Sequence, residues 1–374
     1  MRVIRGLTIC LFVLCAATRT LRAEDAKSNR CEFGIAGDGD ALIVPVTIDG
    51  KTVPFLVDTG ATVTIFDQKL LKTNSRRARN FETASTDQSV AEFDVPAATL
   101  ETYRFRDLLT SVGGMDLQQL RDSIGVDFYG IIGTDFLRRF VVEINFDRGK
   151  LMIQQTTADS ELERLSLTID EYGSPYIRGK IGNWPESEFL IDTGYISHDS
   201  GQLEDRACGY MTSLGQLRRL AKVNSTTAGG AVSEDVYQAS MLKVGDNEVR
   251  RPIFGKGRQN VISLHYLSRY STVVIDFLGK AVYLQKRRIE MEDNYNASGL
   301  FLRLKEGRVV VDSVIQESPA SRAGLKVGDQ ISSINRRSTS QFRLYELERF
   351  LNNSNADIEV TYTRGKVTSS AALK

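Results

Sequence analysis

Two stretches of the chain alternate apolar and polar residues around a tight turn, and each then ends in Asp-Thr-Gly. The first reads "ALIVPVTIDGKTVPFLVDTGA" over residues 41–61, and the second reads "PYIRGKIGNWPESEFLIDTGY" over residues 175–195. The first has an Asp-Gly pair at its centre and the second has Gly-Asn-Trp-Pro, both suited to a hairpin turn. The pattern therefore predicts two β-hairpins whose second strands end at Asp58 and Asp192.

The sequence farther along each copy also matches. Copy one reads "YGIIGTDFLRRFVVEINFDRGKLMIQ" and copy two reads "NVISLHYLSRYSTVVIDFLGKAVYLQ". Both place an apolar strand before a glycine-containing turn and a second strand. Agreement at the start and at the end of each copy indicates an internal repeat. We therefore predict two similar, mostly β lobes, residues 38–156 and 166–287, joined by the charged stretch "TTADSELERL".

Between these landmarks the pattern predicts further strands and two short helices. β-rich segments with turn residues near 82–95 and 224–238 are interpreted as hairpins. Helical spacing of apolar residues favours helices in "MDLQQLRDS" (115–123) and "MTSLGQLRRLA" (211–221).

A third module, residues 297–374, follows the charged linker "KRRIEMEDNYNA". Alternating Val and Ile residues mark its strands, and Ser318-Pro319 begins a short helix that Gly324 ends. The segment "STSQFRLYELERFLNN" has the apolar spacing of an amphipathic helix. The fold class predicted for the whole chain is mainly β: two β-barrel lobes followed by a small β-sandwich capped by helices.

The first 23 residues are typical of an export signal, with basic residues at the start and an apolar run over 7–17. We therefore expect an extracytoplasmic protein, periplasmic or secreted, attached to a membrane only if the signal stays uncleaved. Removal of the signal leaves Cys31 and Cys208. In an oxidising compartment they form either one disulfide or two unpaired buried thiols, and the sequence leaves both open.

Composition excludes several classes of function. The 374 residues are 41% hydrophobic and 25% charged, with a formal net charge of +1, which argues against a nucleic-acid-binding surface. The chain has only two histidines, His198 and His265, so neither a Ser-His-Asp arrangement nor a zinc cluster is supported. His198, which follows the second Asp-Thr-Gly turn by a few residues, is interpreted as an ordinary surface or core residue.

The repeated Asp-Thr-Gly turn indicates acid–base chemistry by a pair of aspartates. Two carboxylates within hydrogen-bond distance cannot both ionise easily, so the pair holds one proton. One member can then activate water while the other polarises a carbonyl group. Glycine permits the sharp turn that exposes each carboxylate, and the threonine hydroxyls can brace the turns across the lobe interface. This chemistry needs no metal ion and no cofactor.

The stretches "FLVDTGA" and "FLIDTGY", together with "IIG" at 131–133, resemble the aspartic peptidases, in particular the retropepsin-like ones, here as two tandem copies arranged as in pepsin. The resemblance covers roughly residues 38–287. It implies an exported aspartic endopeptidase that hydrolyses polypeptides, with the hairpins near 82–95 and 224–238 as flaps. It also implies the site residues: catalytic Asp58 and Asp192, supported by Thr59, Gly60, Thr193 and Gly194.

Copy two departs from the family pattern at two positions. Tyr195 stands where the family usually has a small residue, and Ser263 stands where the second "IIG" element should have glycine. Two alternatives therefore stay open. One is a catalytically weak or inactive peptide-binding protein, and the other is an enzyme that pairs lobe 1 with itself in a homodimer, leaving Asp58 as the only catalytic aspartate.

The third module resembles a PDZ domain of the type found in bacterial exported proteases. The resemblance rests on "SGLFL" and on "SPASRAGLKVGDQISSIN". It implies a site that captures the C-terminus of a peptide or protein as an added strand, through backbone N–H groups of the first motif. The residues implied are Gly299, Leu300, Phe301 and Leu302.

Overall fold

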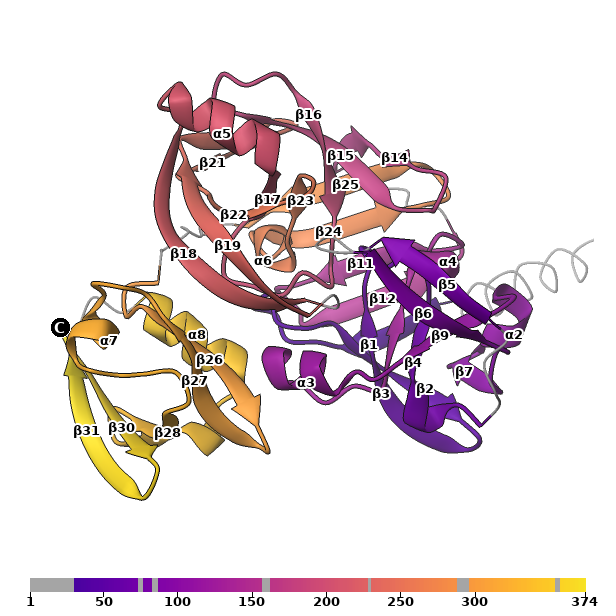
Figure 1. Cartoon of the computed structure of the whole chain (residues 1–374). Helices are drawn as coiled ribbons and strands as arrows, with labels where there is room; N and C mark the ends of the chain where they lie inside the picture. The colour runs from indigo at the N-terminus through magenta and orange to yellow at the C-terminus, as the bar shows by residue number, and fades with distance from the viewer. Residues whose placement is uncertain are drawn as a thin grey trace, which may run out of the picture.

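The structure is a computed structural model that describes residues 30–72, 77–82, 87–156, 162–227, 230–287, 296–353 and 357–374. The predicted signal at 1–23, the tips of both predicted flaps and most of the linker before the third module lie outside the described residues. Figure 1 shows two β-rich lobes beside each other and a smaller unit at the C-terminus. The fold class predicted from sequence, mainly β, is confirmed.

One six-stranded sheet contains strands of both lobes. In spatial order it consists of β1 (Arg30–Gly34), β12 (Lys150–Gln154), β11 (Val141–Asn145), β24 (Tyr270–Asp276), β25 (Ala281–Lys286) and β13 (Glu163–Ser166). The lobes join where β11 pairs antiparallel with β24, Val141 opposite Asp276. Strand β1 precedes the predicted start of lobe 1, so the shared sheet uses residues ahead of position 38.

The rest of each lobe is one large sheet. In lobe 1 the spatial order is β5 (Arg77–Glu82), β6 (Asp87–Phe93), β9 (Val112–Met115), β4 (Ile65–Asp67), β10 (Gly130–Ile132), β3 (Lys51–Val57), β2 (Ile43–Ile48), β7 (Ala98–Leu100) and β8 (Tyr103–Arg104). The predicted hairpin of residues 41–61 is present as β2 and β3, with Asp49 and Gly50 at its turn, both at positive φ.

Lobe 2 repeats this order strand for strand. Its sequence of neighbours is β18 (Leu217–Thr227), β19 (Gly230–Ala239), β22 (Ile253–Gly257), β17 (Gly201–Glu204), β23 (Val261–Ile262), β16 (Ser187–Ile191), β15 (Pro175–Ile181), β20 (Met241–Val244) and β21 (Asn247–Arg250), and β14 (Thr168–Ile169) pairs with β15. Since each strand of lobe 1 has a counterpart in the same place, the internal repeat inferred from sequence is confirmed.

Short helices connect the strands. In the two lobes they are η1 (Gln68–Leu70), α2 (Phe105–Leu108), α3 (Gln118–Ile124), α4 (Thr134–Leu137), α5 (Asp205–Ser213) and α6 (Leu264–Leu267). The helix predicted at 115–123 corresponds to α3. The helix predicted at 211–221 is wrong: the helix α5 ends before Gly215, which has φ +67°, and residues 217–227 form strand β18.

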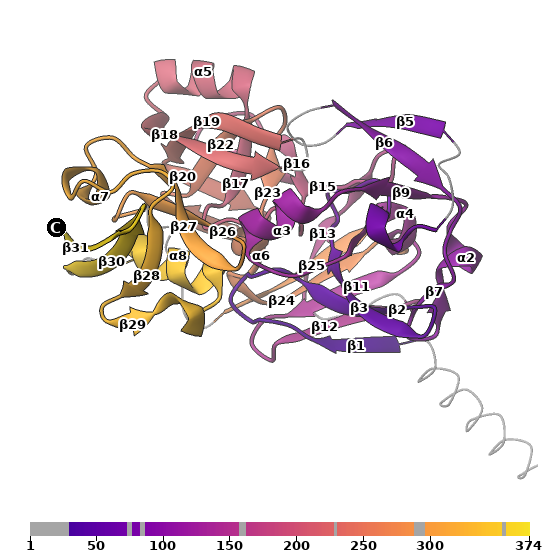
Figure 2. The same ribbon diagram turned by 60° about the horizontal axis from the view of Figure 1, so that its bottom comes forward.

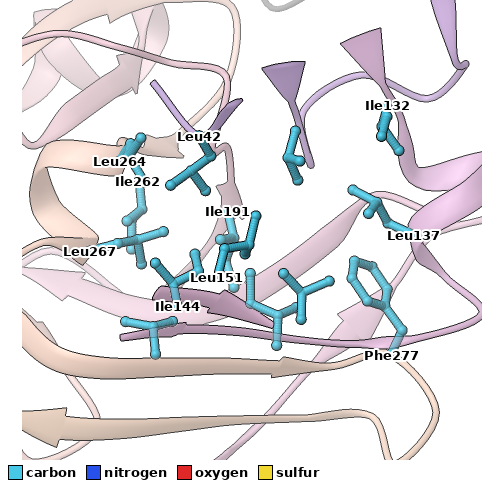
Figure 3. Close-up of a cluster of buried hydrophobic side chains, with 14 of the residues drawn as sticks. Leu42, Ile132, Leu137, Ile144, Leu151, Ile191, Ile262, Leu264, Leu267 and Phe277 are labelled. Carbon is cyan, nitrogen blue, oxygen red and sulfur yellow. The ribbon is translucent and has the colours of Figure 1, made fainter. Parts of the chain in front are cut away.

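The core lies between the shared sheet and the two large sheets. Figure 3 shows apolar side chains from both lobes meeting there, among them Leu42 and Ile132 of lobe 1 and Ile191 and Ile262 of lobe 2. All four are fully buried or nearly so. Because the strands that lead to Asp58 and Asp192 share this core, their ends are held rigidly relative to each other.

The C-terminal unit has its own core and sheet. Its strands are β26 (Leu300–Lys305), β27 (Arg308–Val314), β28 (Gln330–Ile334), β29 (Arg337–Ser338), β30 (Ile358–Arg364) and β31 (Val367–Leu373), and its helices are α7 (Pro319–Arg322), η2 (Thr339–Gln341) and α8 (Leu344–Asn353). Ser318 caps α7 as predicted, by accepting a hydrogen bond from the Ser321 amide. Helix α8 packs beside the edge strand β26, and both lie toward the lobes (Figure 2).

Two of the questions left open by the sequence concern covalent linkage and membranes. Cys31 and Cys208 are both buried and unpaired, so of the two alternatives the structure has the free thiols. Within the part of the chain that the structure describes, no helix is both long and apolar enough to cross a membrane.

Candidate active site

The two Asp-Thr-Gly turns are built by the same strand arrangement. In lobe 1 the strand β3 lies parallel to β10, and the Asp58 amide donates to the Ile132 carbonyl at 3.0 Å. In lobe 2 the strand β16 lies parallel to β23, and the Asp192 amide donates to the Ile262 carbonyl at 3.0 Å. Each aspartate therefore directly follows an apolar strand, at the point where the pairing of that strand with its parallel neighbour ends.

The two threonines join the lobes through a reciprocal set of hydrogen bonds. The amide of Thr59 donates to the Thr193 hydroxyl oxygen at 3.0 Å, and the amide of Thr193 donates to the Thr59 hydroxyl oxygen at 3.1 Å. The Thr59 hydroxyl then donates to the Ile191 carbonyl at 2.6 Å, and the Thr193 hydroxyl to the Val57 carbonyl at 2.9 Å. Both side chains are fully buried, so the network fixes one turn against the other.

The carboxyl groups of the two aspartates face each other. Oδ1 of Asp58 accepts the amides of Gly60 (2.8 Å) and Ala61 (3.1 Å). Oδ1 of Asp192 accepts the amide of Gly194 at 2.9 Å in the same manner. A Cβ on Gly60 would collide with the Asp192 carboxyl group, and one on Gly194 would collide with that of Asp58. Both glycines are therefore needed for the close approach of the pair.

Burial raises the pKa of both carboxyl groups, and the pKa of Asp192 lies well above its ordinary value. For Asp58, hydrogen bonds from backbone amides and from Asp192 act against burial. For Asp192, the charge of Asp58 adds to burial. The two carboxyl groups consequently share one proton.

Tyr195 does not crowd the pair. Its amide donates to Oδ1 of Asp192 at 2.9 Å, as the Ala61 amide does to Asp58 in lobe 1. Its hydroxyl lies beside Gly255, where a Cβ would be 3.3 Å from it and 2.9 Å from the Glu234 carboxylate. The ring is thus directed along the sheet of lobe 2, toward Glu234, and the turn keeps the same hydrogen bonds as in lobe 1.

Ser263 also has a defined place. A Cβ at Gly133 in lobe 1 would lie 2.7 Å from the Val63 carbonyl, so that position requires glycine. In lobe 2 the corresponding Ser263 fits, because its hydroxyl donates to the Asp199 carbonyl at 2.6 Å and accepts the Tyr266 amide at 3.1 Å. The serine thereby caps α6 and ties it to the loop that follows Asp192.

Lobe 1 contains a bracing pair that its sequence did not predict, Thr64 and Asp135. Thr64 lies in the loop after Asp58, and its amide and hydroxyl donate to the Asp135 carboxylate at 3.0 and 2.6 Å. Burial raises the pKa of Asp135, and hydrogen bonds from Thr64 act in the opposite direction. The acidic residue next to "IIGT" was visible in the sequence, but nothing there indicated its partner.

Both predicted flaps are antiparallel hairpins at the end of their sheets. The β5–β6 pair runs from Arg77 opposite Glu92, and the β18–β19 pair from Leu217 opposite Ala239. The connecting residues 83–86 and 228–229, and with them the tips of the flaps predicted at 82–95 and 224–238, lie outside the described residues. Their role over a substrate stays a prediction.

In the third module, most of the backbone N–H groups predicted to bind a peptide carboxylate already donate hydrogen bonds to other residues of the chain. The Gly299 amide donates to Oδ1 of Asn296 at 2.8 Å, and the Leu300 amide to the Ser298 hydroxyl at 3.2 Å. The Leu302 amide donates to Oε1 of Glu348 on α8 at 3.1 Å. Phe301 packs against apolar residues of the β18–β19 hairpin in lobe 2. A ligand on β26 must therefore displace the chain's own acceptors.

Glu348 is a partly buried carboxyl group on α8. Burial raises its pKa to about 7, although the Leu302 amide acts against that shift.

Among the described residues, no three His, Cys, Asp or Glu side chains are grouped as ligands for a metal ion.

Comparison with known proteins agrees with both resemblances. Residues 44–139 match the family model described as gag-polyprotein putative aspartyl protease, and residues 289–363 match the PDZ domain. A search of curated proteins gave no significant match. Among solved structures, the aspartic proteinase from Irpex lacteus is similar, at 14% identity and a TM-score of 0.43, over 69% of this chain and 98% of that chain.

Proposed function

Since the chain contains an aspartyl protease domain followed by a PDZ domain, we propose that it is an aspartic endopeptidase that uses both lobes. The observation that carries this proposal is the Thr59–Thr193 network, which sets two carboxyl groups face to face within one chain. Lobe 2 has the same turn and the same hydrogen bonds as lobe 1 despite Tyr195 and Ser263. This favours a pair formed inside one molecule over pairing of lobe 1 in a homodimer.

In the proposed mechanism the charged Asp58 is the general base and the protonated Asp192 is the general acid. Asp58 takes a proton from water as the water oxygen attacks the carbonyl carbon of the scissile peptide. Asp192 donates its proton to the carbonyl oxygen, giving a tetrahedral diol. Collapse of the diol breaks the C–N bond: the proton on Asp58 passes to the leaving nitrogen, and one hydroxyl of the diol returns its proton to Asp192, which restores the starting state of the pair. The residues Thr59, Gly60, Thr193 and Gly194 hold the geometry throughout.

The test is digestion of unfolded casein by the purified protein beside an Asp58→Ala variant. We expect the protein to degrade casein and the variant to show only background cleavage. Removal of the base should leave folding intact, because Asp58 lies on a turn and not in the apolar core. Equal background cleavage by both proteins would instead support a peptide-binding protein on a protease scaffold.

For the PDZ domain we propose binding of peptide or protein C-termini along β26. An edge strand beside a helix is the arrangement that accepts an added peptide strand. The first 23 residues support the further proposal that the protein acts outside the cytoplasm, in the periplasm or as a secreted enzyme.

A pair of peptides that differ only at the C-terminus tests the PDZ site. In calorimetry with the full chain, a peptide that ends in an apolar residue with a free carboxylate should bind. Its C-terminal amide should bind at least about tenfold more weakly, because a charge-assisted hydrogen bond to a backbone amide is lost. Equal affinities for the two peptides would remove the carboxylate-binding role from residues 299–302.

A further inference from the structure

The helix α8 of the PDZ domain inserts an aromatic side chain into the protease lobes. Tyr345 is only 3% exposed, and its ring stacks on the His198 ring with centroids 4.1 Å apart and planes at 30°. Its hydroxyl lies 3.4 Å from Nδ1 of His265. Tyr345 therefore lies between the loop that follows Asp192 and the helix α6.

In lobe 1 the corresponding contact is made between two residues of the lobe itself, without the PDZ domain. Thr64 and His198 stand at the same position after the aspartate of their lobe. Asp135 and His265 also correspond, since they follow Gly133-Thr134 and Ser263-Leu264. In lobe 1 the Thr64 hydroxyl donates directly to Asp135 at 2.6 Å.

In lobe 2 the two rings at these positions, His198 and His265, have centroids 6.1 Å apart, and Tyr345 contacts both. We propose that Tyr345 is a positioning residue for Asp192: the PDZ domain supplies in lobe 2 the brace that Asp135 supplies in lobe 1. This inference rests on the proposed function of the aspartate pair.

The loop that Tyr345 holds is directly connected to Asp192. The Tyr195 amide donates to the Asp192 carboxyl group, and the Tyr195 carbonyl accepts the Leu264 amide of α6 at 3.2 Å. Ile196 packs into the apolar cluster of lobe 1. A shift of His198 would therefore be transmitted through three residues of a short, well-anchored loop to the carboxyl group.

Charged groups around Tyr345 keep α8 in place. Arg343, directly before the helix, donates to Asp40 and, at 2.8 Å, to Asp38 in the segment before β2. Arg349 lies 3.2 Å from Asp38. A Cβ on Gly39 would be only 3.0 Å from the Tyr345 hydroxyl. The 38–40 segment thus forms the third side of the socket that receives the ring.

The two histidines act as neutral packing groups in this socket. Burial holds the pKa of His198 well below its ordinary value, and it lowers the pKa of His265 to about 3. A neutral imidazole stacked on a phenol ring avoids placing a charge in a buried interface. The contact of α8 with the lobes at this place thus combines ring stacking with the Glu348 carboxyl group, 3.8 Å from Nε2 of His198, and has ion pairs to Asp38 at its rim.

The test compares Tyr345→Ala with Tyr345→Phe in the full chain, using a peptide substrate. We expect Tyr345→Ala to lower kcat about ten- to a hundredfold with KM changed less than twofold, because a small displacement of a reacting group is costly. Tyr345→Phe keeps the stacked ring and should restore most of kcat. Phe350→Ala, on the same helix but 43% exposed, is the control and should match the unaltered protein.

A second measurement does not depend on proteolysis. Amide hydrogen exchange of residues 195–199 should accelerate in Tyr345→Ala, while exchange of Thr64 in lobe 1 should not change. If the unaltered protein cleaves nothing but this exchange pattern appears, the proposed function fails and the brace stands. A folded Tyr345→Ala variant with normal kcat and normal exchange overturns the brace. If that variant does not fold, His198→Ala replaces it with the same expected and contrary results.

Discussion

Replacing either Asp192 or Asp58 by Asn is expected to lower kcat/KM for peptide hydrolysis by about 10²–10⁴-fold. Burial and the charge of Asp58 raise the pKa of Asp192, which in the proposed mechanism is the member that donates the shared proton. An amide fits the same space but cannot deliver that proton to the carbonyl oxygen. Because the two carboxyl groups act as a unit, the double variant should be scarcely slower than either single one.

Thermal unfolding is the control for this experiment. A carboxyl group whose pKa is raised in the folded state stabilises the protein at low pH and loses that contribution as pH rises through the folded value. At neutral pH the Asp192→Asn variant should therefore unfold at the same temperature as the unaltered protein or higher. Full activity of the variant, together with a dimeric mass in solution, would mean that lobe 1 pairs with itself and that Asp58 alone is catalytic.

The aspartate pair could be predicted because its signals are local in sequence. Each Asp-Thr-Gly follows a strand that carries its own apolar pattern, and the second copy repeats the first. The glycines and threonines could be assigned for the same reason. The match of residues 44–139 to an aspartyl protease model covers the first copy, and the order of strands extends the same architecture to the second.

Other parts of the site depend on contacts that no local pattern encodes. Tyr345 is followed at helical spacing by the charged residues Glu348 and Arg349, so its contact with His198 and His265 is visible only in the fold. The helix expected at 211–221 failed for a related reason. Its leucines and arginines also suit a strand that buries Leu217 and Val223 on one side, and a left-handed Gly215 separates it from α5.

The departures in copy two illustrate the limit of comparing residues by position. Tyr195 and Ser263 break the family pattern and first suggested a lobe losing its function. In the structure the Tyr195 backbone supports Asp192, and the Ser263 hydroxyl donates to the loop that carries Asp199. Burial raises the pKa of Asp199 to about 8, which indicates a neutral carboxyl group beside that loop at moderately acid pH. The loop after Asp192 is thus held by other side chains than the loop after Asp58, while the Asp-Thr-Gly turn itself keeps the same hydrogen bonds.

Replacing Arg121 by Met is expected to destabilise the protein by about 3–5 kcal/mol at neutral pH. Arg121 on α3 donates to Asp67 at 2.7 Å, and the two side chains are 4% and 0% exposed. Burial alone would raise the pKa of Asp67, but the hydrogen bond from Arg121 helps to hold that pKa below its ordinary value. Without Arg121 the buried carboxylate loses the cation that is hydrogen-bonded to it, and α3, which packs against β26, loses this anchor to lobe 1.

The pH dependence of this loss separates charge from packing. Asp67 has a lowered pKa in the folded state, so its stabilising contribution is present above the unfolded value of about 3.9 and is lost as pH falls through the folded value. The difference in unfolding free energy between Arg121→Met and the unaltered protein, measured in urea, should therefore be largest from pH 7 down to about pH 4 and shrink as pH falls further. Arg178→Met is the matched control, because the Arg178–Glu186 pair is 71% and 54% exposed and should contribute less than about 1 kcal/mol. A loss for Arg121→Met as small as that of the control, or one that does not change with pH, would show that α3 is held by its apolar contacts instead.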